Sequence, residues 1–305
     1  MLSKPYLIDS NDLSSDDLEI IFKKAKYFKE NFDGSPFNDL KNVTTAFAFF
    51  EPSTRTKLSF ELAAKRLSGT TISYDFQSSS QLKGETLVDT IRTMEAMQVD
   101  LFVVRHSTNG TPEMLQKNTS GSIINAGDGT KDHPTQGLLD AFTLIEKYGD
   151  LSGLKVTIVG GITNSRVAQA NIKILRKLNV EVFLCGPKQL LPTDKIWEGK
   201  IFNYIDDAIE KSDVIMLLRL QKERMDEGKM PSMSEYIKFF GLSSDNIDNK
   251  NISIMHPGPV NYGVELDWEI NKNPNCLIQT QVQNGVFIRM AVLSTLAEKY
   301  KKSSG

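Results

Sequence analysis

The chain has 305 residues, 40% of them hydrophobic and 24% charged, with a formal net charge of -2. That length favours about two domains, and no apolar run reaches the ~20 residues that a membrane-spanning helix needs. Two cysteines imply no disulfide framework, which suits the cytoplasm. The basic residues do not cluster, which argues against a nucleic acid as ligand. The three histidines are widely separated, which argues against a structural metal.

The first half of the sequence alternates between strand and helix, the pattern of a parallel α/β sheet. Apolar residues at helical spacing mark the helices, and short continuous apolar runs mark buried strands. Gly127-Asp128-Gly129 predicts a sharp turn, and Pro134 suits the first turn of a helix. The predicted elements are helix 15–32, strand 43–50, a helix from Pro52 to Gly69, strand 70–74, a helix from Glu85 to Met97, strands 101–104 and 123–126, and helix 133–148.

A glycine-bearing stretch, Gly149 to Gly153, is the predicted domain boundary, because the alternation of strand and helix restarts after it. The stretch from Gln221 to Lys250 is polar and interrupted by Gly, Ser and Asp, so we expect a long loop with short helices there. The other predicted elements are strand 155–159, helix 165–178, strands 180–185, 214–218 and 252–255, a long helix 284–300 and a frayed tail 301–305.

These elements predict an α/β fold of two doubly wound parallel-sheet domains of similar size, with the C-terminal helix packing back toward the N-terminal domain. We expect the first domain to comprise residues 1–148 together with the helix at about 284–300. The second domain is expected to comprise residues 149–283.

The junction after the first predicted strand carries the sequence Ser53-Thr54-Arg55-Thr56. It lies where a buried strand ends and an amphipathic helix begins. Ser53 can cap that helix, and the free amides of its first turn can converge with hydroxyl groups and the Arg55 guanidinium. Such a set of donors predicts an anion site, most naturally for phosphate. A capped helix with an arginine on its surface is the alternative interpretation of this segment alone.

Polar residues also follow the other predicted strands, at Arg105, His133, Arg219 and His256-Pro257. Ligands of open parallel sheets lie outside the carboxyl ends of the strands, so we expect these junctions to line one cleft between the two halves. The absence of a carboxylate pair argues against glycosidase or two-metal chemistry. Group transfer to or from an anionic substrate fits better. The cations and neutral donors expected there are Arg55, Lys83, Arg105, His133, Arg166 and Arg219.

These motifs resemble those of the aspartate/ornithine carbamoyltransferase family. Ser53–Thr56 is similar to the family's carbamoyl-phosphate signature, and His133-Pro134-Thr135-Gln136 to its second signature. Lys83-Gly84-Glu85-Thr86 and Arg219–Arg224 resemble the lysine loop and the acceptor loop of the aspartate branch. His256-Pro257-Gly258-Pro259 stands where ornithine enzymes carry a cysteine-containing motif, so the resemblance disfavours ornithine. It extends from about Leu13 to Leu296, with the motifs in the family's order.

The resemblance implies carbamoyl transfer from carbamoyl phosphate to the amine of L-aspartate, a step of pyrimidine biosynthesis, with no cofactor, no metal and no covalent enzyme intermediate. It implies a cytoplasmic homotrimer with shared active sites, which can join larger assemblies. The residues implied to bind carbamoyl phosphate are Ser53, Thr54, Arg55, Thr56, Arg105, His133, Gln136, Pro257, Gly258 and Pro259. Those implied to be catalytic are Arg55, Thr56, Lys83, Arg105 and His133.

The acceptor side follows from the same resemblance. Arg166 and Arg219 are implied to bind the two carboxylates of aspartate, assisted by Gln221, and Lys83 to contact both substrates. Ser79 and Lys83 are implied to come from the neighbouring subunit. Two departures concern this side: Gly160-Gly161 stands where many members have Gly-Asp, and Asn164 where many have His.

Two alternatives stay open at this point. The chain could carbamoylate a different amino acid, although the set Arg166, Arg219 and Gln221 disfavours this. It could also be a silent homologue that serves as a binding or assembly subunit. Such a chain should have lost one of Arg55, Arg105, His133 or Lys83, and none is missing.

Overall fold

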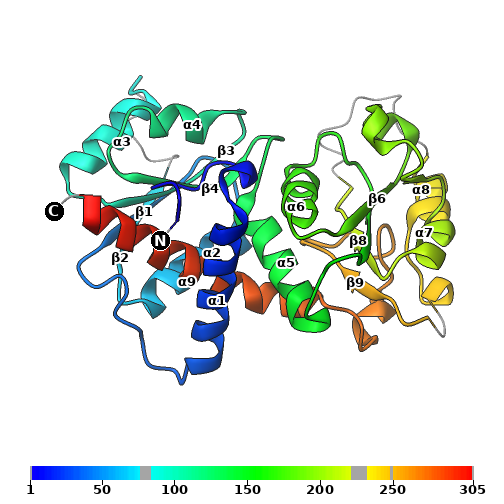
Figure 1. Ribbon diagram of the computed structural model, residues 1–305. Helices are drawn as coiled ribbons and strands as arrows, with labels where there is room; N and C mark the ends of the chain where they lie inside the picture. Colours follow the sequence, from blue (N-terminus) through cyan, green and yellow to red (C-terminus); the bar gives the residue numbers. More distant parts are fainter. Residues whose placement is uncertain (1, 76–83, 221–231, 248–249, 304–305) are drawn as a thin grey trace. The chain divides into compact units, whose positions relative to one another are not determined.

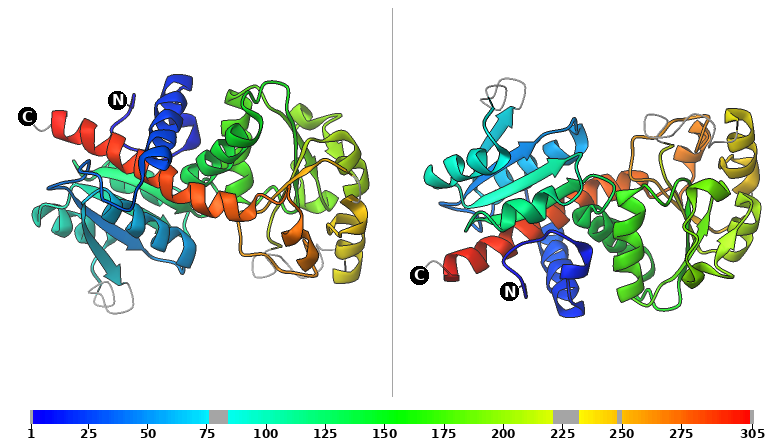
Figure 2. Two further views of the ribbon diagram at one scale, coloured as in Figure 1. Left: turned by 90° about the horizontal axis from the view of Figure 1, so that it is seen from below. Right: turned by 90° about the horizontal axis from the view of Figure 1, so that it is seen from above.

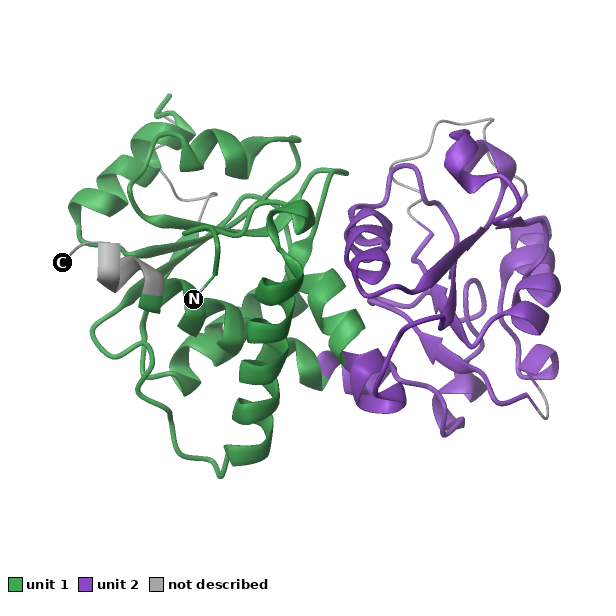
Figure 3. Cartoon of the chain, viewed as in Figure 1, with its two compact units in different colours: residues 1–142, 283–305 green, residues 143–282 purple. Residues whose placement is uncertain are grey.

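A computed structural model of the chain describes residues 2–75, 84–220, 232–247 and 250–303. The chain divides into two compact units, drawn in different colours in Figure 3. Unit 1 comprises Met1–Phe142 and Gln283–Gly305, and unit 2 comprises Thr143–Val282. Each unit has its own sheet, one of four strands and one of five, and every strand pairing in both is parallel. The predicted fold of two doubly wound parallel-sheet domains is therefore confirmed.

The sheet of unit 1 has the strand order β2-β1-β3-β4 (Figure 1). Strands β1, β3 and β4 are largely buried, as is usual for parallel sheets, whereas the edge strand β2 is more polar and more exposed. The strands are β1 (Thr44–Phe49), β2 (Thr70–Asp75), β3 (Leu101–His106) and β4 (Ser122–Asp128). The helices are η1 (Ser10–Asp12), α1 (Ser15–Asn31), α2 (Thr54–Arg66), α3 (Leu87–Ala96), α4 (Thr111–Gln116) and the larger part of both α5 (Pro134–Tyr148) and α9 (Ile278–Ser303).

Helices cover both faces of this sheet: α3 and α4 lie on one side, and α2 and α9 on the other (Figure 1). Alternate residues of β1 and β3 face α3 and α4, as the two-residue repeat of a strand requires. The buried residues on that side are Ile8, Ala46, Ala48, Ile91, Met94, Val99, Phe102, Val104, Leu115 and Ile123. A hydrophobic core therefore holds the strands on the side of α3 and α4.

The last helix, α9, returns the chain to unit 1, as predicted. Figure 2 shows its C-terminal part, in red, alongside α1, in blue. Lys24 of α1 pairs with Glu298 of α9, and the Nζ atom of Lys29 lies 2.8 Å from Oδ1 of Asn284. The helix begins earlier than predicted, and it continues to Ser303, where we expected a frayed tail. None of the described helices combines the length and the apolar character needed to cross a membrane.

The sheet of unit 2 has the strand order β7-β6-β5-β8-β9. Helix α6 lies on one face of it, and α7 and α8 lie on the other (Figure 1). The strands are β5 (Lys155–Val159), β6 (Glu181–Cys185), β7 (Ile201–Phe202), β8 (Val214–Leu217) and β9 (Ser253–Met255). The helices are α6 (Arg166–Lys177), η4 (Lys188–Leu190), η5 (Lys195–Trp197), α7 (Ile205–Lys211), α8 (Met233–Phe240), η7 (Asp245–Ile247) and η8 (Trp268–Lys272).

One detail differs from the sequence prediction. Strand β4 continues through Gly127 to Asp128, so the sharp turn begins later than predicted, where Gly129 has a φ of 46°. Within the stretch where we expected a loop with short helices, α8 is a helix of eight residues, closed at its start by a reciprocal capping box between Ser232 and Glu235. That Ser-x-x-Glu pattern is a recognised helix-start signal, so the sequence does contain the information.

Candidate active site

The predicted site residues of unit 1 gather at one edge of its sheet. Strands β1, β3 and β4 are neighbours, and all three are parallel, so their carboxyl ends meet at that edge. Ser53–Thr56 follows β1, Arg105 is the next-to-last residue of β3, and His133 and Gln136 follow β4. Distant segments of the chain thus contribute to a single edge, as the junction pattern predicts.

Helices α2, α5 and α6, which carry most of these residues, share an electrostatic property. None has an acidic residue in its first turn. By contrast, α1, α3, α4, α7 and α8 each have at least one there. Acidic residues stabilise the positive end of a helix dipole, and cations there are repelled by it. Helix α9 also lacks an acidic residue there, but only α2, α5 and α6 follow strands of the two sheets directly and place Arg55, His133 and Arg166 at their N-termini, an arrangement that favours a bound anion.

At the start of α2, Ser53 occupies the N-cap position, but its side chain makes no capping hydrogen bond. The prediction that the hydroxyl group caps the helix is therefore wrong, although the position is right. Its backbone is extended, with φ at -160° and ψ at 95°. Thr54 and Arg55 are exposed, and Thr56 is buried. The segment thus presents hydroxyl and guanidinium donors beside the free amides of the first helical turn.

Arg105 is held in place by a carboxylate. Its Nε atom lies 2.7 Å from Oε1 of Glu51 in an ion pair whose two side chains are only 14% and 13% exposed. Its Nη1 donates to the carbonyl of Ala126 at 3.3 Å. Because both contacts come from the ends of neighbouring strands, the guanidinium is fixed at the sheet edge. Charge-assisted hydrogen bonds of this kind are strong, and a guanidinium held at this edge is a group suited to recognising a phosphate.

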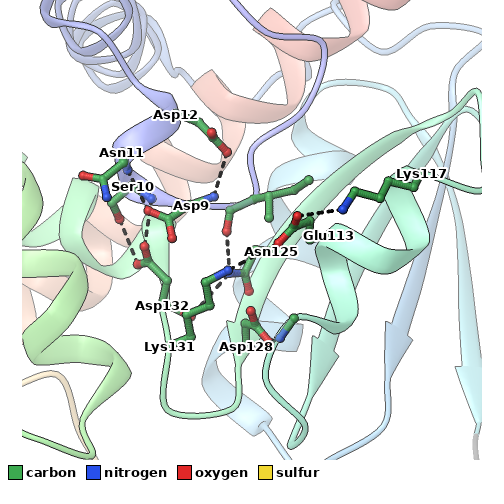
Figure 4. Close-up of polar contacts among 12 residues, drawn as sticks. Asp9, Ser10, Asn11, Asp12, Glu113, Lys117, Asn125, Asp128, Lys131 and Asp132 are labelled. Atoms are coloured by element: carbon green, nitrogen blue, oxygen red, sulfur yellow. Dashed lines mark hydrogen bonds and ion pairs between the residues drawn. The ribbon is translucent and has the colours of Figure 1, made fainter.

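The loop before α5 is organised by Asp132, which is fully buried. Its carboxylate accepts three hydrogen bonds: from the amide of Ser10 at 2.8 Å, from the hydroxyl of Ser10 at 2.8 Å and from the amide of His133 at 2.7 Å. Figure 4 shows Asp132 against Ser10, with the side chain of Asn125 close by. Asn125 donates to the carbonyls of Ile8 and Asp132 at 2.7 and 3.4 Å. The N-terminal segment therefore fixes the position of His133.

In unit 2, Arg166 is the first residue of α6 and is only 7% exposed. It follows a tightly built loop. Ser165 caps the helix by accepting from the amide of Ala168, and the amides of Ile162 and Thr163 both donate to the carbonyl of Leu190. Gly161 has no side chain, and the side chain of Asn164 takes no part in these bonds, so the two departures from the family pattern leave the loop's own backbone contacts in place.

The other two junctions of unit 2 share a buried carboxylate, Glu265, which is fully inaccessible. It accepts from the amide of Leu220 at 2.6 Å, directly after Arg219, and from the backbone and side-chain N–H groups of Asn261 at 2.8 Å. Strands β5, β8 and β9 are neighbours, so Arg166, Arg219 and the turn 257–259 stand at one edge of this sheet. Within that turn, the amide of Gly258 donates to Nδ1 of His256 at 2.8 Å.

Three predicted site residues, Ser79, Lys83 and Gln221, lie outside the described residues. The predicted cleft would join residues of both units and stays a prediction. Five charged residues near the predicted site residues carry only weak signals in the sequence and were not predicted; four of them are buried, and Glu51 is partly buried. They are Glu51 beside Pro52, Asp132 beside His133, Asp140 four residues after Gln136, Glu265, and Arg289 as a cation within an apolar run.

Comparison with known proteins decides the family. Residues 6–146 match the family model described as the carbamoyl-P binding domain of aspartate/ornithine carbamoyltransferases, and residues 152–296 match the Asp/Orn binding domain. The chain belongs to the aspartate/ornithine carbamoyltransferase family.

Family members with the name aspartate carbamoyltransferase catalytic subunit are similar over nearly their whole length. The protein of Christiangramia forsetii is 47% identical over 99% of both chains, and that of Campylobacter hominis is 46% identical over 96% of this chain and 97% of the other. The M. jannaschii aspartate transcarbamoylase catalytic subunit superposes with a TM-score of 0.87 at 33% identity, covering 97% of this chain and 99% of that one. The structure of the Trypanosoma cruzi aspartate transcarbamoylase in complex with carbamoyl aspartate and phosphate superposes with a TM-score of 0.87 at 28% identity, covering 96% of each chain.

The buried Asp132 generates a testable prediction. Asp132→Ala should lower the free energy of unfolding by about 3 kcal/mol or more, because three buried donors lose their acceptor at about 1–3 kcal/mol each. Lys131→Ala is the matched control, since Lys131 is its half-buried neighbour and makes only a 3.5 Å ion pair with Glu113. Urea unfolding of the two variants checks this. Equal stabilities would show that Asp132 does not anchor the loop.

Proposed function

We propose that this chain transfers the carbamoyl group of carbamoyl phosphate to the amine of L-aspartate, giving N-carbamoyl-L-aspartate and phosphate. One observation supports it above the others: three helices at the carboxyl edges of the two sheets begin without acidic residues and with Arg55, His133 and Arg166 instead. Both substrates are anions, one with a phosphate group and one with two carboxylates. The names of the full-length relatives agree with this chemistry.

The residues of unit 1 would bind carbamoyl phosphate. Ser53, Thr54, Arg55 and Thr56 would hold the phosphate at the positive end of α2, where N–H groups and the helix dipole favour an anion. Arg105, kept in place by Glu51, would reach both the phosphate and the carbonyl oxygen. The turn 257–259 of unit 2 and Gln136 would bind the carbamoyl NH2 group through carbonyl oxygens.

The residues of unit 2 would bind the acceptor. Arg166 and Arg219 are suited to the two carboxylates of aspartate, because a guanidinium can make paired hydrogen bonds to a carboxylate. Arg166 stands at the first position of α6, so the helix dipole acts in the same sense. Gln221 would assist, and Lys83 would contact both substrates.

The reaction follows from these roles. The neutral amine of aspartate attacks the carbamoyl carbon, forming a C–N bond and placing negative charge on the carbonyl oxygen. Thr56, Arg105 and His133 would donate hydrogen bonds to that oxygen; removal of one such donor typically costs about 10²–10³ in turnover. The C–O bond to phosphate then breaks, and the departing phosphate takes both electrons and the amine proton. No enzyme nucleophile is required, and alignment of the two substrates can contribute about 7–11 kcal/mol.

We further propose a cytoplasmic homotrimer acting in pyrimidine biosynthesis, with Ser79 and Lys83 supplied by the neighbouring subunit. Both cysteines, Cys185 and Cys276, are free thiols, which suits a reducing compartment. The family resemblance supports the shared site.

Replacement of Arg55 tests the phosphate site. Arg55→Ala should lower turnover of carbamoyl phosphate at least about 10²–10³-fold with unchanged unfolding, because Arg55 is exposed and its helix is held by buried residues such as Phe60. Lys65→Ala is the control, since it removes an exposed cation from the last turn of the same helix. Steady-state kinetics and circular dichroism give both readouts. Near-normal activity of a folded Arg55→Ala enzyme would contradict the proposal.

Mixed trimers test the shared site. Sedimentation of the wild type should give a particle of three chains of 34.2 kDa. Arg55→Ala and Lys83→Ala chains, each inactive alone, should regain up to about a third of wild-type activity after dissociation and reassembly together, because a closed ring of mixed chains contains one site with both residues intact. Failure of the mixture to regain activity, in trimers of proven mixed composition, would show that Lys83 serves its own chain.

A further inference from the structure

Gln136 is held by a buried carboxylate. The Nε2 group of Gln136 donates a hydrogen bond at 2.9 Å to Oδ1 of Asp140, four residues further along α5. Gln136 is 8% exposed and Asp140 is fully buried. Residues four apart lie on the same face of a helix, so the backbone of α5 itself sets this contact. A carboxylate this deep needs a nearby positive charge or several donors.

Arg289 of α9 is a buried cation close to this part of α5: a Cβ atom on Gly285 would lie 2.6 Å from its Nη1 and 3.2 Å from Cδ2 of Leu139, the neighbour of Asp140 in the sequence. The Arg289 side chain is only 3% exposed, its Nη1 donates to the carbonyl of Gly285 at 2.9 Å, and its guanidinium carbon lies 5.1 Å from the centre of the Phe60 ring. Burial lowers the pKa of Arg289 to about 10, while the charge of Asp140 opposes this and that of Arg105 adds to it. The guanidinium is therefore still protonated at neutral pH.

The packing leaves little freedom for this guanidinium. A Cβ atom on Gly285 would lie 2.6 Å from Nη1 of Arg289, so the glycine makes room for it. The Nε atom of Arg289 is buried without a hydrogen-bond partner among the described residues. A buried cation kept in such a place despite its desolvation indicates a role for its charge.

The charge of Asp140 decides which way the Gln136 amide faces. An ionised carboxylate can only accept hydrogen bonds, so it must receive the NH2 group of the amide. The oxygen Oε1 of Gln136 is then turned away from Asp140. It is an acceptor, and the carbamoyl NH2 group is a donor.

We propose that Asp140 and Arg289 are positioning residues that orient the amide of Gln136 so that its oxygen accepts from the NH2 group of carbamoyl phosphate. This inference rests on the proposed function and deepens it. Through Gln136, Asp140 and Arg289 would allow the enzyme to distinguish carbamoyl phosphate from acyl phosphates that lack an NH2 group. Neither residue touches the substrate.

Acetyl phosphate is the probe, because it replaces the NH2 group by a methyl group and keeps the phosphate and the carbonyl. For each variant, the KM of carbamoyl phosphate and the inhibition constants of acetyl phosphate and inorganic phosphate are measured. In Asp140→Asn, the new amide can donate to Oε1 and reverse the orientation of Gln136. We expect the KM of carbamoyl phosphate to rise about tenfold, the range of a lost hydrogen bond, while both inhibition constants change less than about twofold.

A second variant and a control complete the test. Arg289→Met nearly keeps the volume of the side chain and removes its charge. It should raise the KM of carbamoyl phosphate relative to the inhibition constant of acetyl phosphate, as Asp140→Asn does, and it serves as the test if Asp140→Asn does not fold. Leu139→Val shortens a buried neighbour on α5 and should leave the ratio of carbamoyl to acetyl phosphate unchanged.

The outcomes separate the two proposals. Equal changes in the constants of carbamoyl and acetyl phosphate, in folded Asp140→Asn and Arg289→Met enzymes, would overturn the positioning role and leave carbamoyl transfer standing. A folded wild type that shows no transfer to any acceptor and no binding of acetyl phosphate would instead overturn the proposed function.

Discussion

The positive ends of three helices are the constraint on which the site depends. In a parallel α/β sheet, a helix usually follows each strand, and the free N–H groups of its first turn lie at the carboxyl edge of the sheet. Helices α2, α5 and α6 leave that edge without acidic residues, whereas α1, α3, α4, α7 and α8 neutralise theirs. Arg55 and Arg166 add charge where the dipole repels it. We propose that these helices give up some stability for affinity toward anions.

Buried carboxylates make this arrangement of cations and donors rigid. Glu51 pairs with Arg105, Asp132 holds the loop before His133, Glu265 holds the turn after Arg219, and Asp140 holds Gln136. Asp132 and Asp140 lie one and four residues from the side chains that they position. Glu51 and Glu265 lie far from Arg105 and Arg219 in the sequence and contact them, or the residue next to them, from another segment. In each unit, negatively charged side chains thus hold predicted site residues in place. A preorganised set of donors is what stabilises charge that develops during group transfer.

The sequence was sufficient for the alternation of elements and the junctions, because buried parallel strands are nearly continuous apolar runs. It was insufficient where structure depends on tertiary contacts. Helix α4 has six residues, and Gly110 precedes it with a φ of 84°, so no periodicity could reveal it. Serine is a preferred N-cap residue, so Ser53 was predicted to cap α2 through its side chain, yet its hydroxyl group makes no capping hydrogen bond. Arg289 lies in an apolar run, and only the packing of α9 against α2 shows its importance.

Acceptor choice tests the central claim most directly. The measurement is formation of ureido product from carbamoyl phosphate with aspartate, ornithine and acetylornithine offered in parallel to the wild-type chain. Product from aspartate alone is the predicted result. Product from ornithine or acetylornithine instead would contradict the roles given to Arg166 and Arg219 while retaining those of Ser53–Thr56. No product from any of the three would contradict carbamoyl transfer itself.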